Sequence, residues 1–265
     1  MYPKEYKMIF FVFVLNFFSI ETQVIKTLST GSNLLEFKDY NNIGLFITND
    51  KLFSNLANEN PTVLFDNQNF ESNSVFATYD SDYLLIACST TNLLGSIKIN
   101  TGEETTLYLY SNVFERFYQT DDFCSISYLN TYAFVVHTEG QGNGNQIKLS
   151  VVKIKLTSSS SGPSIGNSPS RIQFSIPCYT NSDFKYISCE VINIIDSNTD
   201  YGLVCGYIKK ESSTYLYVVA PMNIAFSWFS GEITIHSSES LINFDLQRIN
   251  NTYIRYLIGS NSYEL

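Results

Sequence analysis

The feature that most constrains this chain is a short pattern that occurs four times. A polar turn is followed by a tyrosine and an apolar run in DSDYLLIAC (80–88), LNTYAFVVH (129–137), NTDYGLVCG (198–206) and NNTYIRYLIG (250–259). An apolar run also precedes each turn, so each stretch reads as a β-hairpin. Aromatic rings can bind carbohydrate, but repetition at equivalent positions favours a structural role for the four tyrosines, Tyr83, Tyr132, Tyr201 and Tyr253.

The pattern predicts an all-β chain of antiparallel units. Helical periodicity is nearly absent after the N-terminus, and the one weak helix candidate is NVFERFYQ at 112–119. The markers recur about every 40–70 residues, Ile43 takes the tyrosine's place in a degenerate first copy, and further strands fit between them. Four-stranded units at such intervals are typical of β-propeller blades. We expect a propeller-like array of about four to five blades with the last incomplete; a β-sandwich or two stacked all-β domains is the alternative.

One tract breaks the regular spacing. Residues 157–170, TSSSSGPSIGNSPS, have the composition of a flexible insertion or linker. If the chain holds two domains, they divide here. No WD dipeptide, kelch glycine pair or sialidase-type Asp box occurs in any unit, so the pattern points to an architecture and not to a family.

Residues 1–22 are typical of a secretory signal peptide. Lys4 and Lys7 precede an apolar stretch of 13 residues, 8–20. A signal-peptide core has about 7–15 apolar residues, whereas a membrane-spanning helix needs about 20. We therefore expect residues 23–265 to form a secreted or cell-surface domain. A membrane anchor through an uncleaved N-terminal segment is the alternative, and no later apolar run approaches spanning length.

Secretion makes the five cysteines disulfide candidates: Cys88, Cys124, Cys178, Cys189 and Cys205. Cys189 and Cys205 lie nearly symmetrically about a turn, which favours a bridge within one hairpin. A Cys178–Cys189 bridge competes with it, and a Cys88–Cys124 bridge between units is also open. The chain has only two histidines and no C-x-x-C, so we expect no metal site. The sequon NNT makes Asn250 a glycosylation candidate.

The charge distribution bears on partners. The net charge is −9, and no run of Lys or Arg is longer than the pair Lys209–Lys210. Nucleic-acid binding needs clustered cations, so we expect no nucleic-acid partner. A protein or carbohydrate ligand is the expected partner, although the sequence does not identify it.

No catalytic set can be recognised in the sequence. The glycine-rich EGQGNGNQ (139–146) lies between two strands and not before a helix, so it reads as a turn and not as a phosphate loop. His137 ends an apolar strand, where a structural role is the expected one for a histidine. We predict a secreted or cell-surface binding module without catalytic activity or cofactor. The alternatives are a secreted hydrolase or lyase on a propeller scaffold, and the N-terminal fragment of a larger surface receptor.

Overall fold

The structure is a computed structural model. It describes residues 34–40, 43–48, 51–55, 62–66, 74–80, 82–88, 93–99, 101–108, 123–139, 147–167, 169–175, 184–193, 201–224, 228–229, 231–250 and 253–259. These residues contain β-strands and no helix, which confirms the all-β prediction. The expected signal peptide, the helix candidate at 112–119 and Cys178 lie outside the described residues.

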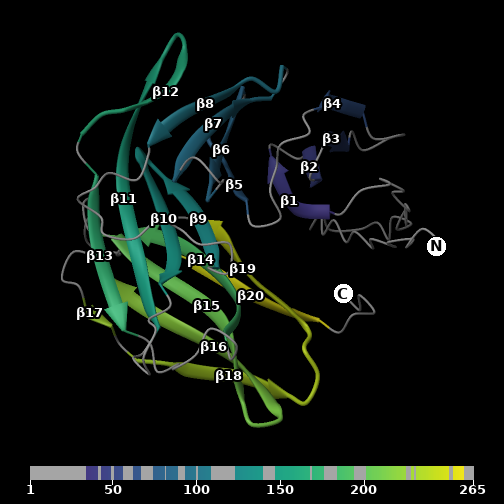
Figure 1. Ribbon diagram of the computed structural model, residues 1–265, viewed down its shortest axis with the longest axis vertical. Helices are drawn as coiled ribbons and strands as arrows, with labels where there is room; N and C mark the ends of the chain where they lie inside the picture. The colour runs from purple at the N-terminus through teal and green to yellow at the C-terminus, as the bar shows by residue number, and fades with distance from the viewer. Residues whose placement is uncertain are drawn as a thin grey trace, which may run out of the picture.

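The strands form five antiparallel sheets in chain order (Figure 1). Sheet 1 contains β1 (Leu34–Tyr40), β2 (Ile43–Thr48), β3 (Lys51–Asn55) and β4 (Thr62–Asp66); sheet 2 contains β5 (Val75–Thr78), β6 (Tyr83–Ala87), β7 (Leu94–Lys98) and β8 (Glu104–Tyr108). Sheet 3 contains β9 (Cys124–Leu129), β10 (Tyr132–Glu139), β11 (Lys148–Ser159), β12 (Gly162–Ile165) and β13 (Ser170–Ser175). Sheet 4 contains β14 (Phe184–Asn193), β15 (Tyr201–Glu211), β16 (Thr214–Asn223), β17 (Trp228–Phe229) and β18 (Ile233–Ser238), and sheet 5 contains β19 (Asn243–Asn250) and β20 (Tyr253–Gly259).

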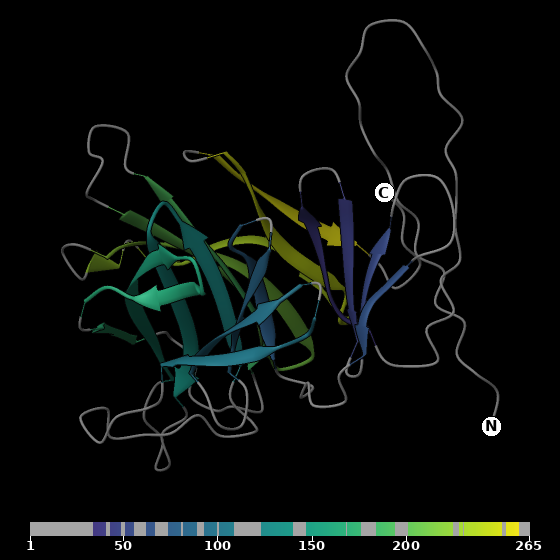
Figure 2. The same cartoon turned by 90° about the horizontal axis from the view of Figure 1, so that it is seen from above.

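The sheets follow one another around the molecule in the order of the sequence. In Figure 1 they run from sheet 1 on the right, through sheet 2 above and sheet 3 on the left, to sheet 4 below. Figure 2 shows sheet 5 between sheets 4 and 1. The first strands of consecutive sheets contact each other: β1 with β5, β5 with β9, β9 with β14 and β14 with β19. The first strand of each sheet is therefore a main point of contact with the next.

The turn in the repeated pattern closes a hairpin whose second strand begins with the tyrosine. In sheet 3, Leu129 pairs with Tyr132, and Asn130 at the turn has a φ of 58°. Asn tolerates this left-handed region better than most residues, because its short polar side chain bonds nearby backbone. The Tyr128 hydroxyl donates a hydrogen bond to the Asn130 carbonyl at 2.5 Å and holds the turn.

Sheet 3 is buried on both faces. Because neighbouring residues of a strand point to opposite faces, β10 directs Ala133 and Val135 toward sheet 2 and Phe134 and Val136 toward sheet 4. All four side chains are fully buried. This explains why AFVV is a continuous apolar run and not an alternating one.

Sheet 5 packs on sheet 4 through one face of β19. Phe244 and Leu246 join a buried cluster with Ile208 and Tyr217 of sheet 4. The Phe244 ring lies over Gly206, where a Cβ atom would come within 2.6 Å of the ring. The glycine therefore provides the space into which the ring fits.

The Ser/Gly/Pro tract at 157–170 belongs to sheet 3. It contains the end of β11, all of β12 and the first residue of β13. Thr157 and Ser164 hydrogen-bond through their hydroxyls across the β11–β12 hairpin at 2.9 Å. The Tyr83 ring of sheet 2 lies 2.8 Å from where a Cβ of Gly162 would be. The described residues of this tract thus form a paired hairpin that contacts sheet 2.

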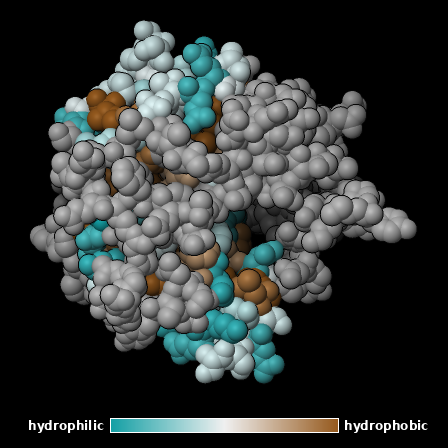
Figure 3. All heavy atoms as spheres, viewed as in Figure 1, coloured by the Kyte–Doolittle hydropathy of each residue, from teal (hydrophilic) through white to brown (hydrophobic). Residues whose placement is uncertain are grey.

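The exposed apolar surface is divided. On the face in Figure 3, hydrophobic residues of the described chain appear in separate patches and not as one continuous area. Among the described residues, the large apolar side chains with high exposure are Tyr186, Ile233, Leu241, Tyr253, Tyr256 and Leu257. Half of these residues belong to β20.

Candidate functional site

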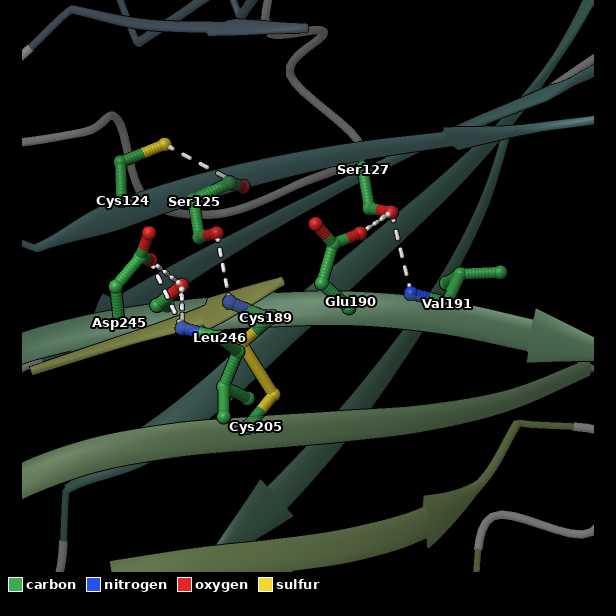
Figure 4. The surroundings of a disulfide bond; sticks show 10 residues. Cys124, Ser125, Ser127, Cys189, Glu190, Val191, Cys205, Asp245 and Leu246 are labelled. Atoms are coloured by element: carbon green, nitrogen blue, oxygen red, sulfur yellow. Dashed lines mark hydrogen bonds between the residues drawn. A yellow bond between two sulfur atoms is a disulfide. The ribbon is translucent and has the colours of Figure 1, made fainter. Parts of the chain in front are cut away.

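Two serines of β9 hydrogen-bond to the backbone of β14 (Figure 4). Ser125 and Ser127 are two positions apart, so both side chains leave the same face of the strand. The Ser125 hydroxyl accepts the N–H of Cys189 at 2.9 Å, and the Ser127 hydroxyl accepts the N–H of Val191 at 3.1 Å. The two serines thus join sheet 3 to sheet 4.

The N–H groups that the serines bind lie on an edge of β14 that no strand of the described residues covers. Cys189 faces Cys205 across the β14–β15 pair with a Cα–Cα distance of 4.2 Å, close to the spacing of a non-hydrogen-bonded pair. The N–H of Cys189 is therefore directed away from β15. Buried N–H groups need acceptors, and the serine hydroxyls provide them.

The same contact recurs between sheets 4 and 5. The hydroxyl of Ser188 accepts the N–H of Leu246 at 3.2 Å and donates to the Asp245 carboxylate at 2.7 Å. Between sheets 3 and 4, the Ser127 hydroxyl likewise donates to the Glu190 carboxylate at 2.7 Å. At both junctions one serine binds an acidic residue and the N–H of the apolar residue that follows it. We call these contacts, together with those of Ser125, the first-strand seam.

Arg248 connects three sheets at the seam. Its Nη1 donates to the carbonyl of Val191 at 3.1 Å, and its Nη2 donates to the carbonyl of Tyr128 at 2.6 Å. The guanidinium therefore links β19 to the first strands of sheets 3 and 4. Its fixed fork of donors suits two carbonyl groups on neighbouring strands.

A disulfide joins sheets 2 and 3 at the end where the sheets connect. Cys88, directly after β6, bonds to Cys124, the first residue of β9, with a Cα–Cα distance of 6.5 Å. The second disulfide among the described residues is Cys189–Cys205, which joins the two strands of one hairpin. This is the bridge expected from the symmetric placement of the two cysteines about the turn, and Cys178–Cys189 was the competing pairing. His137 lies opposite Cys124 in the β9–β10 register and is buried. The two disulfides indicate an oxidising environment.

A charged network lies in sheet 4 at the same end. The Nζ of Lys209 contacts the Glu232 carboxylate at 2.7 Å and that of Glu211 at 3.2 Å, and the Tyr207 hydroxyl donates to Glu232. Burial alone lowers the pKa of Lys209, but the two carboxylates outweigh it, and the pKa is raised above that of ordinary lysine. The buried ammonium is therefore protonated and anchors Glu232, which precedes β18.

The four marker tyrosines each begin the second strand of their sheets: Tyr83 in β6, Tyr132 in β10, Tyr201 in β15 and Tyr253 in β20. Their surroundings differ. The rings of Tyr132 and Tyr201 make an edge contact at 5.4 Å, with the Lys153 ammonium 4.3 and 4.7 Å from their centroids. Tyr253 is 67% exposed.

The seam is the part of the molecule that sequence reasoning missed. Ser125 and Ser127 appear in CSIS only as polar residues that interrupt an apolar strand, and Ser188 appears in the same way in ISC. The residues that these serines bind also form a pattern in the sequence. In the first strands of sheets 4 and 5, an acidic residue is followed directly by an apolar one, as Glu190–Val191 and Asp245–Leu246. The glycosylation candidate Asn250 ends β19 and pairs with Tyr253 across the turn.

Family models and curated protein sequences were compared with this chain, and neither gave a match. Within the described ranges, three or more His, Cys, Asp or Glu side chains do not gather into a possible metal site. Among those residues there is also no helix with the length and apolar character needed to cross a membrane.

Proposed function

We propose that this protein is an extracellular, β-propeller-like binding module that recognises a protein or carbohydrate ligand through one end of its sheets. The propeller-like arrangement is supported by the contacts between consecutive first strands and by the burial of sheet 3 on both faces. Blades of a propeller bury their faces against their neighbours in this way.

The observation that carries the proposal is the Cys88–Cys124 disulfide. It lies at the end of the molecule where β8 and β13 finish and β9 and β14 start. The segments between sheets depart from this end, and such segments carry binding functions when a rigid scaffold positions them. The network of Lys209 and Glu232 secures the same end in sheet 4. We call it the connection end.

Secretion is tested by expressing the full coding sequence in eukaryotic cells. We expect the protein in the medium, with an N-terminus after residue 22 and both disulfides intact by non-reducing peptide mapping. Treatment with peptide N-glycosidase should reduce the mass if Asn250 carries a glycan. Retention in the cytosol with reduced cysteines would overturn the proposed location.

Ligand recognition is tested with a panel of purified glycans and extracellular proteins. One variant replaces 112–119, in the connection between β8 and β9, with a Gly/Ser segment of equal length. The control variant replaces Ser160 and Ser161 in the β11–β12 turn, at the other end of sheet 3, with Gly. We expect the first variant to lose binding and the second to retain it, with both folded. Equal binding by both variants would contradict recognition through the connection end.

A further inference from the structure

The edge of β20 opposite β19 has no partner in the described part of the chain. In the other four sheets the second strand has a neighbour on both sides: β2, β6, β10 and β15 each pair with the strand before and the strand after. In each case the following strand is antiparallel. β20 holds the second-strand position of sheet 5 and pairs with β19 alone.

Three other edge strands, β8, β12 and β18, have features that hinder further pairing. β12 has only four residues and contains Pro163, and β8 begins with the exposed Glu104. β18 is irregular because its register with β16 shifts at Tyr217–Val218. Short length, charge, proline and irregularity are the usual means of blocking edge-to-edge pairing. β20 has seven residues without proline, and its register with β19 is regular from Ile254 to Gly259.

The side chains of β20 are apolar and exposed. Tyr253, Tyr256 and Leu257 are 67%, 55% and 37% exposed. The one charged residue of the strand is Arg255, whose Nε and Nη2 donate to the side-chain Oε1 of Gln247 at 3.0 and 2.6 Å. This contact holds the guanidinium over β19 and away from the bare edge.

We propose that β20 pairs with β20 of a second copy of this chain. A two-fold axis brings identical strands together antiparallel, the orientation found between second and third strands in the other sheets. The product is a four-stranded sheet of β19, β20 and their copies, with as many strands as sheets 1 and 2.

The sequence of β20 is compatible with this symmetry. Pairing centred on Tyr256 places Ile254 opposite Ile258 of the partner copy. It also places Tyr253 opposite Gly259, and an aromatic ring can cover the backbone of a cross-strand glycine. Arg255 faces an apolar residue of the partner copy, so no like charges lie directly opposite each other.

The test is sedimentation equilibrium of the secreted chain together with hydrogen exchange. We expect the apparent mass to double as concentration rises, with the amides of 253–259 becoming slower to exchange over the same range. Tyr256→Lys and Leu257→Lys, on opposite faces of β20, should each shift the equilibrium to monomer by placing a charge at the edge. The matched control is Ile233→Lys, because Ile233 is a similarly exposed apolar residue on β18.

Two results would overturn the proposal. One is a monomer at all concentrations whose β20 amides exchange rapidly, which would show a bare edge. The other is a monomer whose β20 amides are protected at every concentration, which would show that the same chain covers the edge. A dimer lost in Ile233→Lys and retained in both β20 variants would place the interface elsewhere and overturn it equally.

Discussion

The hydroxyl of Ser127 accepts the backbone N–H of Val191 at 3.1 Å, across the boundary between sheets 3 and 4. Ser127 is almost fully buried, and its hydroxyl also donates to Glu190. If this hydroxyl is removed, the buried N–H of Val191 loses its acceptor and the half-buried carboxylate of Glu190 loses a donor. The loss is costly because Val191 is fully buried, so its N–H is left without an acceptor.

Ser127→Ala should therefore destabilise the protein by about 1–3 kcal/mol, the penalty for an unsatisfied buried donor. Urea unfolding measures the change. Ser160→Ala is the control, because Ser160 is exposed at the β11–β12 turn, and it should change stability by less than about 0.5 kcal/mol. Ser188→Ala should cost less than Ser127→Ala, because the Leu246 N–H also donates to the Asp245 carboxylate at 2.9 Å and keeps that acceptor. Equal stability of Ser127→Ala and Ser160→Ala would refute a stabilising role for the seam.

Gly206 and Phe244 provide a test of how sheet 5 packs on sheet 4. In Gly206→Ala the new Cβ would lie 2.6 Å from the Phe244 ring, so the ring must move. Overpacking of this kind costs about 1–3 kcal/mol. Gly259→Ala is the matched control at protein concentrations where the chain is monomeric, since a Cβ there meets nothing within 4 Å of the same chain. We expect a lower thermal midpoint for Gly206→Ala alone; similar midpoints for the two variants would contradict this packing.

The disulfides should contribute according to the chain length that they close. Cys88–Cys124 spans 36 residues and Cys189–Cys205 spans 16. Loop-closure entropy gives about 4 and about 3 kcal/mol, respectively, for the two bridges. Paired Cys→Ala variants, one for each bridge, measure these contributions by urea unfolding. If either pair costs less than about 1 kcal/mol, the entropic account fails for that bridge.

The hairpins could be predicted from the sequence because their causes are local. A turn residue such as Asn130 and the apolar runs beside it determine where β9 ends and β10 begins. The Cys189–Cys205 bridge follows from the same register. Tertiary contacts leave no such signal: Arg248 binds carbonyls 57 and 120 positions away in sequence. Which strand edge a serine or arginine reaches depends on how the sheets pack.

Tyr128 provides a prediction about alkaline pH. Burial, with smaller contributions from Tyr79 and Asp80, raises its pKa from 10.0 to about 12. The folded protein thus holds this proton more tightly than the unfolded chain. The stability that follows from this difference is complete below pH 10 and is lost as the pH rises through about 12.

Tyr128→Phe cannot ionise at this position, so its stability should decline less steeply than that of the wild type over this alkaline range. Urea unfolding at a series of pH values gives both profiles, and absorbance of tyrosinate reports the missing titration directly. Tyr256→Phe, which removes an exposed hydroxyl, serves as the control. We expect the difference spectrum between wild type and Tyr128→Phe to develop near pH 12. If the difference spectrum instead develops near pH 10, the ordinary pKa of tyrosine, the prediction of a raised pKa is wrong. The Tyr128 hydroxyl would then be open to water despite its contact with Asn130.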